Sequence, residues 1–248
     1  MENRYISHNL EWTDEKVARF WNFRNSFKPY DSTWFTKQAG GALLNFINKK
    51  VSLKGKVLDY GTGKGFLVKR ILDDFPDLFV YACDFTESLV TETNVQNKNH
   101  TKFKGCTYIN SLPSVYLENF FDFVFLIETI EHLTDNYLNA SLQEIKRILK
   151  PGGVVIISTP NEEVLENTYV HCADCGATFH HMQHIRSWSA QSLGAKMNEF
   201  SFSQLHNAGV NINWYGSKGI FHLLMDKTKS LFTPHSPRNL IYIGKKLS

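Results

Sequence analysis

The pattern of hydrophobic and polar positions changes near residue 50. Before that point aromatic and apolar residues recur at helical spacing, and Thr13 followed by two acids is a typical helix start. A second helix is expected over residues 36–48. Beyond residue 50, short apolar runs alternate with amphipathic segments. They predict strands over residues 56–60, 79–83, 107–109, 121–126 and 154–158, and helices over residues 66–74, 87–98, 135–149 and 190–207.

Strands that alternate with helices of this length predict an α/β protein whose parallel sheet is covered on both faces. One stretch breaks the alternation: residues 161–188 are dense in His and Cys. A connection that long inside a compact domain is usually functional or carries its own organising element. We therefore expect an aromatic helical cap over residues 1–50 and a main domain over residues 51–248, in which residues 161–188 form a lid.

Composition narrows the class of protein. Hydrophobic residues make up 42% and charged residues 21%, which excludes disordered and fibrous classes. The net charge of +3 is too small to indicate a nucleic-acid partner by itself, although residues 216–248 carry six Lys or Arg against one acid. A solvated basic edge is the favoured interpretation of that segment, and an anionic partner is the alternative. Apolar runs fall far short of the roughly 20 residues that cross a bilayer, and no secretory signal is recognisable, so we expect a cytoplasmic protein without a membrane span.

Residues 56–66 predict a nucleotide-type loop, because a strand runs into Gly61, Gly63 and Gly65 and then into a helix. The next strand ends in Asp84, and 84 − 65 places it 19 residues after the last glycine. An acid at that point can accept hydrogen bonds from both ribose hydroxyls of an adenosine group. Asp59, just before the glycines, suits a ligand with an ammonium and a sulfonium better than a pyrophosphate. This favours S-adenosylmethionine over a dinucleotide.

Four segments in order, residues 57–65, 82–88, 121–133 and 149–161, resemble the motifs of class I S-adenosylmethionine-dependent methyltransferases. The resemblance implies a doubly wound, mostly parallel seven-stranded sheet of Rossmann-like type. The family often has an Asp near the adenine amino group where this chain has Asn110 and Ser111. The cofactor-binding residues that the resemblance implies are Asp59, Gly61, Thr62, Gly63, Gly65, Phe66, Asp84, Phe85, Asn110, Ser111 and Ile127.

Methyl transfer is an in-line displacement, so the enzyme must align the reactants, exclude water and, for a hydroxyl acceptor, remove a proton. The resemblance places Glu128 beside the transfer site. His132, one helical turn later, is the candidate base, and the alternative is that it only packs beneath the lid. We expect O-methylation of a small molecule or a sugar-type acceptor.

The Cys/His-rich stretch contains a C-x-x-C pair, Cys172 and Cys175. His180 and His184 complete a C-x2-C-x4-H-x3-H set, which is typical of structural Zn²⁺. His171 or His181 can replace either histidine, and unmetallated thiols are the alternative. A similar Cys/His run follows the Thr-Pro-Asn motif in a group of bacterial class I methyltransferases.

Two rival functions use the same residues. Residues 128–132 together with His181 and His184 resemble the metal ligands of small-RNA 3′-terminal 2′-O-methyltransferases, although that pattern gives no role to the cysteine pair. A subunit that binds S-adenosylmethionine without catalysis is the non-enzymatic alternative. The intact glycine and acidic motifs argue against it.

Overall fold

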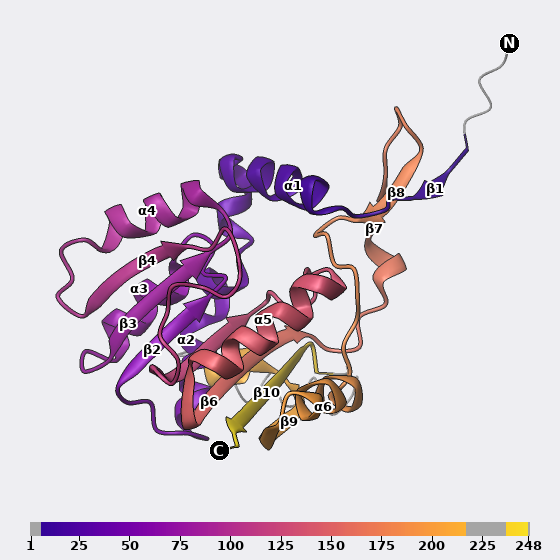
Figure 1. Cartoon of the computed structure of the whole chain (residues 1–248). Coiled ribbons are helices and arrows are strands. Elements are labelled where there is room, and N and C mark those ends of the chain that lie inside the picture. Colours follow the sequence, from indigo (N-terminus) through magenta and orange to yellow (C-terminus); the bar gives the residue numbers. More distant parts are fainter. Residues whose placement is uncertain (1–5, 217–236, 248) are drawn as a thin grey trace, which may run out of the picture.

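The computed structural model describes residues 6–216 and 237–247 of the chain. Its centre is a seven-stranded sheet with the order β4-β3-β2-β5-β6-β10-β9, in which β10 is antiparallel to both neighbours and the pairs from β4 to β6 are parallel. Figure 1 shows the sheet between two layers of helices. The strands are β2 (Lys56–Tyr60), β3 (Phe79–Asp84), β4 (Phe103–Tyr108), β5 (Phe121–Ile127), β6 (Leu149–Pro160), β9 (Phe202–Val210) and β10 (Asn239–Lys246).

Helices cover both faces of this sheet because successive strand residues point to opposite sides and both sides are apolar. Val57 packs with α2 (Phe35–Asn48), α3 (Phe66–Asp74) and α4 (Glu87–Asn97). Leu58 packs on the other side with α5 (Asp135–Ile148) and α6 (Ala190–Glu199). The expected doubly wound, mostly parallel seven-stranded fold is thereby confirmed.

The predicted helix over residues 190–207 is wrong in its second half. The helix α6 ends at Glu199, Ser201 takes a positive φ of 62°, and β9 follows. An edge strand pairs on one side only, and most residues of β9 are partly exposed, so its sequence lacks the apolar run that marks the central strands.

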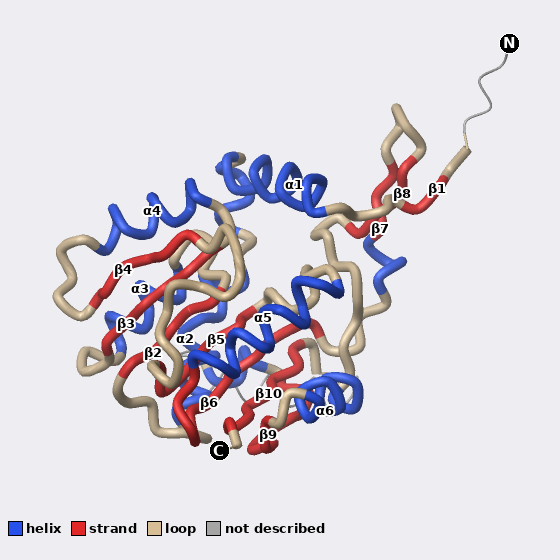
Figure 2. Tube along the Cα trace, in the orientation of Figure 1, coloured by secondary structure: helices blue, strands red, loops and turns tan. Residues whose placement is uncertain are grey.

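The Cys/His-rich stretch has its own small sheet. The strand β7 (Tyr169–His171) pairs antiparallel with β8 (Ala177–His180), and β1 (His8–Asn9) pairs parallel with β8. In Figure 2 this sheet stands beside the main body, and α1 (Asp14–Ser26) runs from it over the strand ends. The indole N–H of Trp21 on α1 donates to Oε1 of Gln183 over 2.7 Å. The N-terminal segment and the stretch after β6 therefore form one connected structure.

The basic segment predicted near the C-terminus lies mostly outside the described residues, since Lys218, Lys227 and Lys229 fall between 217 and 236. Within the described ranges, no helix has the length and apolar character needed to cross a membrane.

Candidate active site

The glycine-rich turn after β2 takes a backbone conformation that favours glycine. Gly61, Gly63 and Gly65 have φ values of 80°, 56° and 70°. A Cβ on Gly63 would lie 2.6 Å from the ring of Trp34, closer than carbon atoms can approach. Glycine at position 63 therefore makes room for the ring of Trp34, and the backbone of Gly61 and Gly63 lines the cavity at the ends of the strands.

Asp84 closes this turn from the end of β3. Its Oδ2 accepts the N–H of Gly63 over 2.8 Å, and its Oδ1 accepts the N–H of Thr86 over 2.8 Å. Burial raises the pKa of Asp84 to about 6, so the carboxylate is still ionised at neutral pH. Asp84 lines the cavity, where its carboxylate can accept hydrogen bonds from a ligand.

Asp59 lies behind the turn. Its carboxylate accepts the hydroxyl of Thr62 over 2.7 Å, and burial raises its pKa to about 7. In this position Asp59 holds the shape of the loop.

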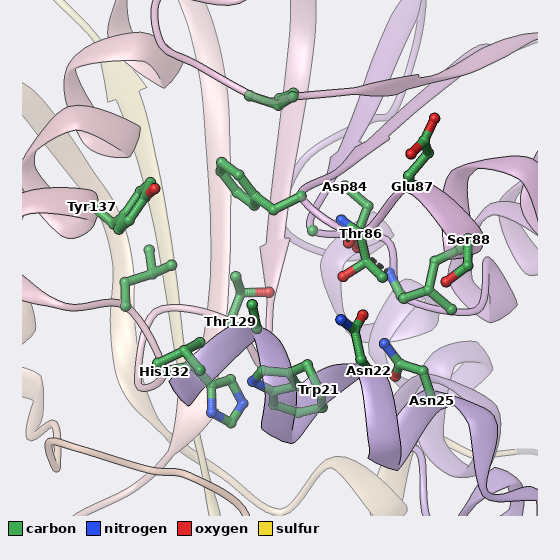
Figure 3. A pocket seen from close by; sticks show the side chains of 18 of the residues that line it. Trp21, Asn22, Asn25, Asp84, Thr86, Glu87, Ser88, Thr129, His132 and Tyr137 are labelled. Carbon is green, nitrogen blue, oxygen red and sulfur yellow. Dashed lines mark hydrogen bonds between the residues drawn. The ribbon is translucent and has the colours of Figure 1, made fainter. Parts of the chain in front are cut away.

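A cavity of about 610 Å³ opens above the ends of the strands, within the range of small-ligand sites. Figure 3 shows Asp84 and Thr86 at one side of it and Thr129 and His132 at the other. The residues expected at the site that line this cavity are Gly61, Gly63, Asp84, Phe85, Asn110, Glu128 and His132. Those expected at the site that are not among its lining residues are Asp59, Thr62, Gly65, Phe66, Ser111 and Ile127.

Sequence reasoning expected Trp21 near the acceptor but did not identify several other lining residues, above all Asn22 and Asn25 of α1. Trp21, Asn22 and Asn25 project from this helix into the cavity (Figure 3). Asn25 is 8% exposed, and neither atom of its amide has a hydrogen-bond partner among the described residues. A buried amide without a partner is costly, which marks this side of the cavity as a place for a polar ligand group. The sequence did contain a signal for these amides, because polar residues lie between the aromatic residues of α1.

Glu128 follows β5 with a positive φ of 48°, a strained conformation for a residue with a side chain. Its Oε1 accepts the hydroxyl of Ser158 over 2.7 Å. Burial raises the pKa of Glu128 to about 7. The carboxyl group is thus set to exchange a proton near neutral pH.

His132 lies beside Glu128, between α1 and the Cys/His-rich stretch. Its ring is 4.9 Å from that of Trp21 and 4.9 Å from that of His184, measured between centroids. Burial, assisted by neighbouring His184, lowers the pKa of His132 to about 3. The imidazole is therefore neutral at physiological pH.

The four residues expected to hold zinc are not brought together. His180 and His184 contact Glu163, with nitrogen to oxygen distances of 3.2 and 2.5 Å. Cys172 and Cys175 lie on the turn between β7 and β8, and β8 carries the chain away from this turn before it reaches His180. Within the described chain, the groups of three or more potential ligand atoms lying within 4.8 Å of one another are Glu131/His132/His184 and Glu163/His180/His184, and neither includes a thiol.

Comparison with known proteins agrees with this geometry. The family described as "Methyltransferase domain" matches residues 20–207. The chain is 23% identical to the malonyl-[acyl-carrier protein] O-methyltransferase of Bacillus anthracis over 136 residues, 54% of this chain and 48% of that protein. It is 30% identical to a tRNA N(3)-cytidine methyltransferase of Bos taurus over 110 residues, 41% of this chain and 29% of that protein. The chain thus spans half or less of the length of these curated relatives.

A solved structure of 1,6-didemethyltoxoflavin-N1-methyltransferase from Burkholderia thailandensis, with its substrate and S-adenosylhomocysteine bound, has the same fold. The TM-score is 0.65 at 15% identity, over 98% of this chain and 94% of that one. Since the family match covers most of the chain, the protein belongs to the methyltransferase domain family, and its fold is that of the S-adenosylmethionine-dependent methyltransferases.

Proposed function

We propose that this protein transfers the methyl group of S-adenosylmethionine to a hydroxyl of a small-molecule acceptor. The observation that carries the proposal is the continuity of one cavity. It joins Gly63 and Asp84, which suit a nucleoside, to Glu128 and His132, which suit proton transfer.

The residues present fit S-adenosylmethionine. The carboxylate of Asp84 is ionised at neutral pH and lines the cavity, where it can accept hydrogen bonds from ribose hydroxyls. Phe85 lines the cavity as well, and the backbone of Gly61 and Gly63 borders the part of it that we assign to the amino-acid group. When bound, the cofactor supplies an electrophilic methyl group on a sulfonium.

Glu128 is our candidate for the proton acceptor, in preference to His132. A general base works best when its pKa lies near the operating pH, and the pKa of Glu128 is about 7 whereas that of His132 is about 3. Ser158 holds the carboxylate of Glu128 in place. His132 then lines the transfer site as a neutral imidazole.

Aromatic and amide side chains also line the cavity, from Trp21, Tyr137, Asn22 and Asn25. Aromatic faces with amide donors suit a sugar or a ring hydroxyl. The first relative named above is an O-methyltransferase, which agrees with transfer to oxygen.

The test is an activity screen by mass spectrometry. Wild-type protein and Asp84→Asn are incubated with methyl-deuterated S-adenosylmethionine and pools of hydroxylated small molecules. We expect a product heavier by one labelled methyl group with wild type only. Saturable cofactor binding without any labelled product from hydroxyl, amine or thiol pools would contradict the enzymatic proposal and favour a binding subunit.

A second candidate acceptor is the 3′-terminal ribose of an RNA. The juxtaposition of His132 and His184 favours it, because these residues resemble part of the pattern of that enzyme class. Short RNA with an intact 3′ end, compared with the same RNA after periodate oxidation, separates this acceptor from the small molecules.

A further inference from the structure

Glu131 carries a buried carboxylate oxygen without a partner. Its side chain is 1% exposed, and its Oε2 accepts the hydroxyl of Thr159 over 3.0 Å. Its Oε1 accepts no hydrogen bond from any described residue. Burying a polar oxygen in this way is costly unless a hydrogen-bond donor or a cation meets it.

The ring of His132 presents a free nitrogen to this oxygen. Its Nδ1 lies 3.4 Å from the carbonyl oxygen of Gln183, and a carbonyl only accepts, so Nδ1 carries the proton. Nε2 is then a bare acceptor, 3.7 Å from Oε1 of Glu131. The gap between the two atoms is too long for a hydrogen bond.

His184 is oriented in the same way. Its Nδ1 is 2.5 Å from Oε2 of Glu163, and a carboxylate at this distance holds the proton on Nδ1. The Nε2 of His184 is then the nitrogen free to bind. A carboxylate that holds the far nitrogen of an imidazole is the arrangement by which proteins orient metal-binding histidines.

The structure assigns a divalent transition-metal site to Glu131, His132 and His184, with Glu163 as the residue that positions His184. One potential ligand atom from each of the three lies within 4.8 Å of the other two. Two atoms bound to one ion at about 2.1 Å can be at most about 4.2 Å apart, so the 3.7 Å between Glu131 and His132 fits. Two imidazoles and a carboxylate suit zinc and its neighbours better than magnesium.

The neighbouring group of Glu163, His180 and His184 lacks a free nitrogen on His180. Nδ1 of His180 accepts the N–H groups of Met182 and His184 over 3.1 and 3.3 Å. Its Nε2 therefore carries the proton and donates to Glu163, which leaves no free nitrogen for a metal. Through these hydrogen bonds, His180 instead stabilises the turn that positions His184.

Three protein ligands leave coordination positions open, and His132 lines the cavity. The open positions suit an acceptor that binds through oxygen. This consequence, unlike metal binding itself, rests on the proposed function. The metal would lower the pKa of the acceptor hydroxyl, whose proton passes to Glu128 while the oxygen forms the new bond to the methyl carbon and the carbon–sulfur bond breaks toward sulfur.

The test is titration of the full-length, chelator-treated protein with Co²⁺, read by visible absorption, and with Zn²⁺ in equilibrium dialysis. We expect one site per chain in wild type. Binding should weaken at least about tenfold in Glu131→Gln and His184→Ala, and about 10- to 100-fold in Glu163→Gln through misorientation of the ligand. The matched control is the Cys172→Ser/Cys175→Ser double variant, which should bind as wild type does.

Circular dichroism and S-adenosylmethionine titration show which variants remain folded, independently of the metal. If Glu131→Gln fails to fold, the metal affinities of His184→Ala and Glu163→Gln still decide whether the site exists. No binding in wild type, or binding lost in the cysteine variant and retained in His184→Ala, would overturn the site. If the wild-type protein does not bind S-adenosylmethionine, the proposed function is refuted, and the metal titration still decides whether the metal site exists.

Discussion

The two sides of the cavity differ in how their polar groups are satisfied. On the side of Gly63 and Asp84, the carboxylate of Asp84 accepts the backbone N–H groups of Gly63 and Thr86. These hydrogen-bond partners come from consecutive βα units. On the side of His132, the contacts join distant segments, and Oε1 of Glu131 has no partner among the residues described. The first side is a hydrogen-bonded frame, whereas the second is incomplete in the sense that a buried polar atom has no partner among the described residues.

The largest effect is expected on the incomplete side, from Glu128→Gln. The amide keeps the shape but accepts no proton, so kcat should fall about 10²- to 10⁴-fold with little change in cofactor affinity. Single-turnover rates and calorimetry on the same preparation measure both quantities. An unchanged kcat would remove Glu128 from proton transfer.

On the frame side, Asp84→Asn should weaken S-adenosylmethionine binding about 10- to 100-fold. The variant loses the charge of an acceptor that hydrogen-bonds to the ligand, a contribution of about 1.5–3 kcal/mol. Asp73→Asn, an exposed acid of an i,i+4 pair on α3, is the matched control and should bind as wild type does. Equal affinities in the two variants would show that Asp84 does not hold the ligand.

The same carboxylate predicts a pH dependence of cofactor affinity. Because burial raises the pKa of Asp84 to about 6, the accepting ionised form is complete above that pH and is lost as the pH falls through it. The association constant should drop about tenfold between pH 7 and pH 5. Calorimetry at several pH values measures this slope, and a slope as steep in Asp84→Asn would exclude Asp84 as its source.

A smaller effect is expected where the two sides meet. Nζ of Lys64 on the glycine turn contacts Oδ1 of Asp31 in the N-terminal segment, and the Lys64 side chain is only 8% exposed. Asp31→Asn should lower the free energy of unfolding by about 1–2 kcal/mol, since the buried ammonium loses its counter-charge. Thermal denaturation measures this loss. Glu15→Gln, which removes an exposed pair with Arg19, is the control and should have almost no effect.

Sequence reasoning was effective on the frame side because its determinants are local. The boundaries predicted for Lys56–Tyr60 and Phe66–Asp74 match β2 and α3, and the glycine turn between them imposes its own conformation. The placement of Asp84 follows from strand order alone.

The other side was harder to predict because its contacts depend on tertiary packing. The spacing of Cys172, Cys175, His180 and His184 indicated one metal site, but β8 separates the thiols from the histidines. Glu163 carries no local signal, since its role arises only when the stretch after β6 folds back onto the turn after β5. The inward direction of Asn25 likewise depends on where α1 lies.

The most direct test of the account is a crystal structure of the protein with S-adenosylhomocysteine. The account predicts the ribose hydroxyls on the carboxylate of Asp84, the amino-acid part against the turn at Gly63, and the sulfur facing Glu128. A nucleoside bound outside this cavity, or one inside it that leaves Asp84 without contact, would contradict the central claim.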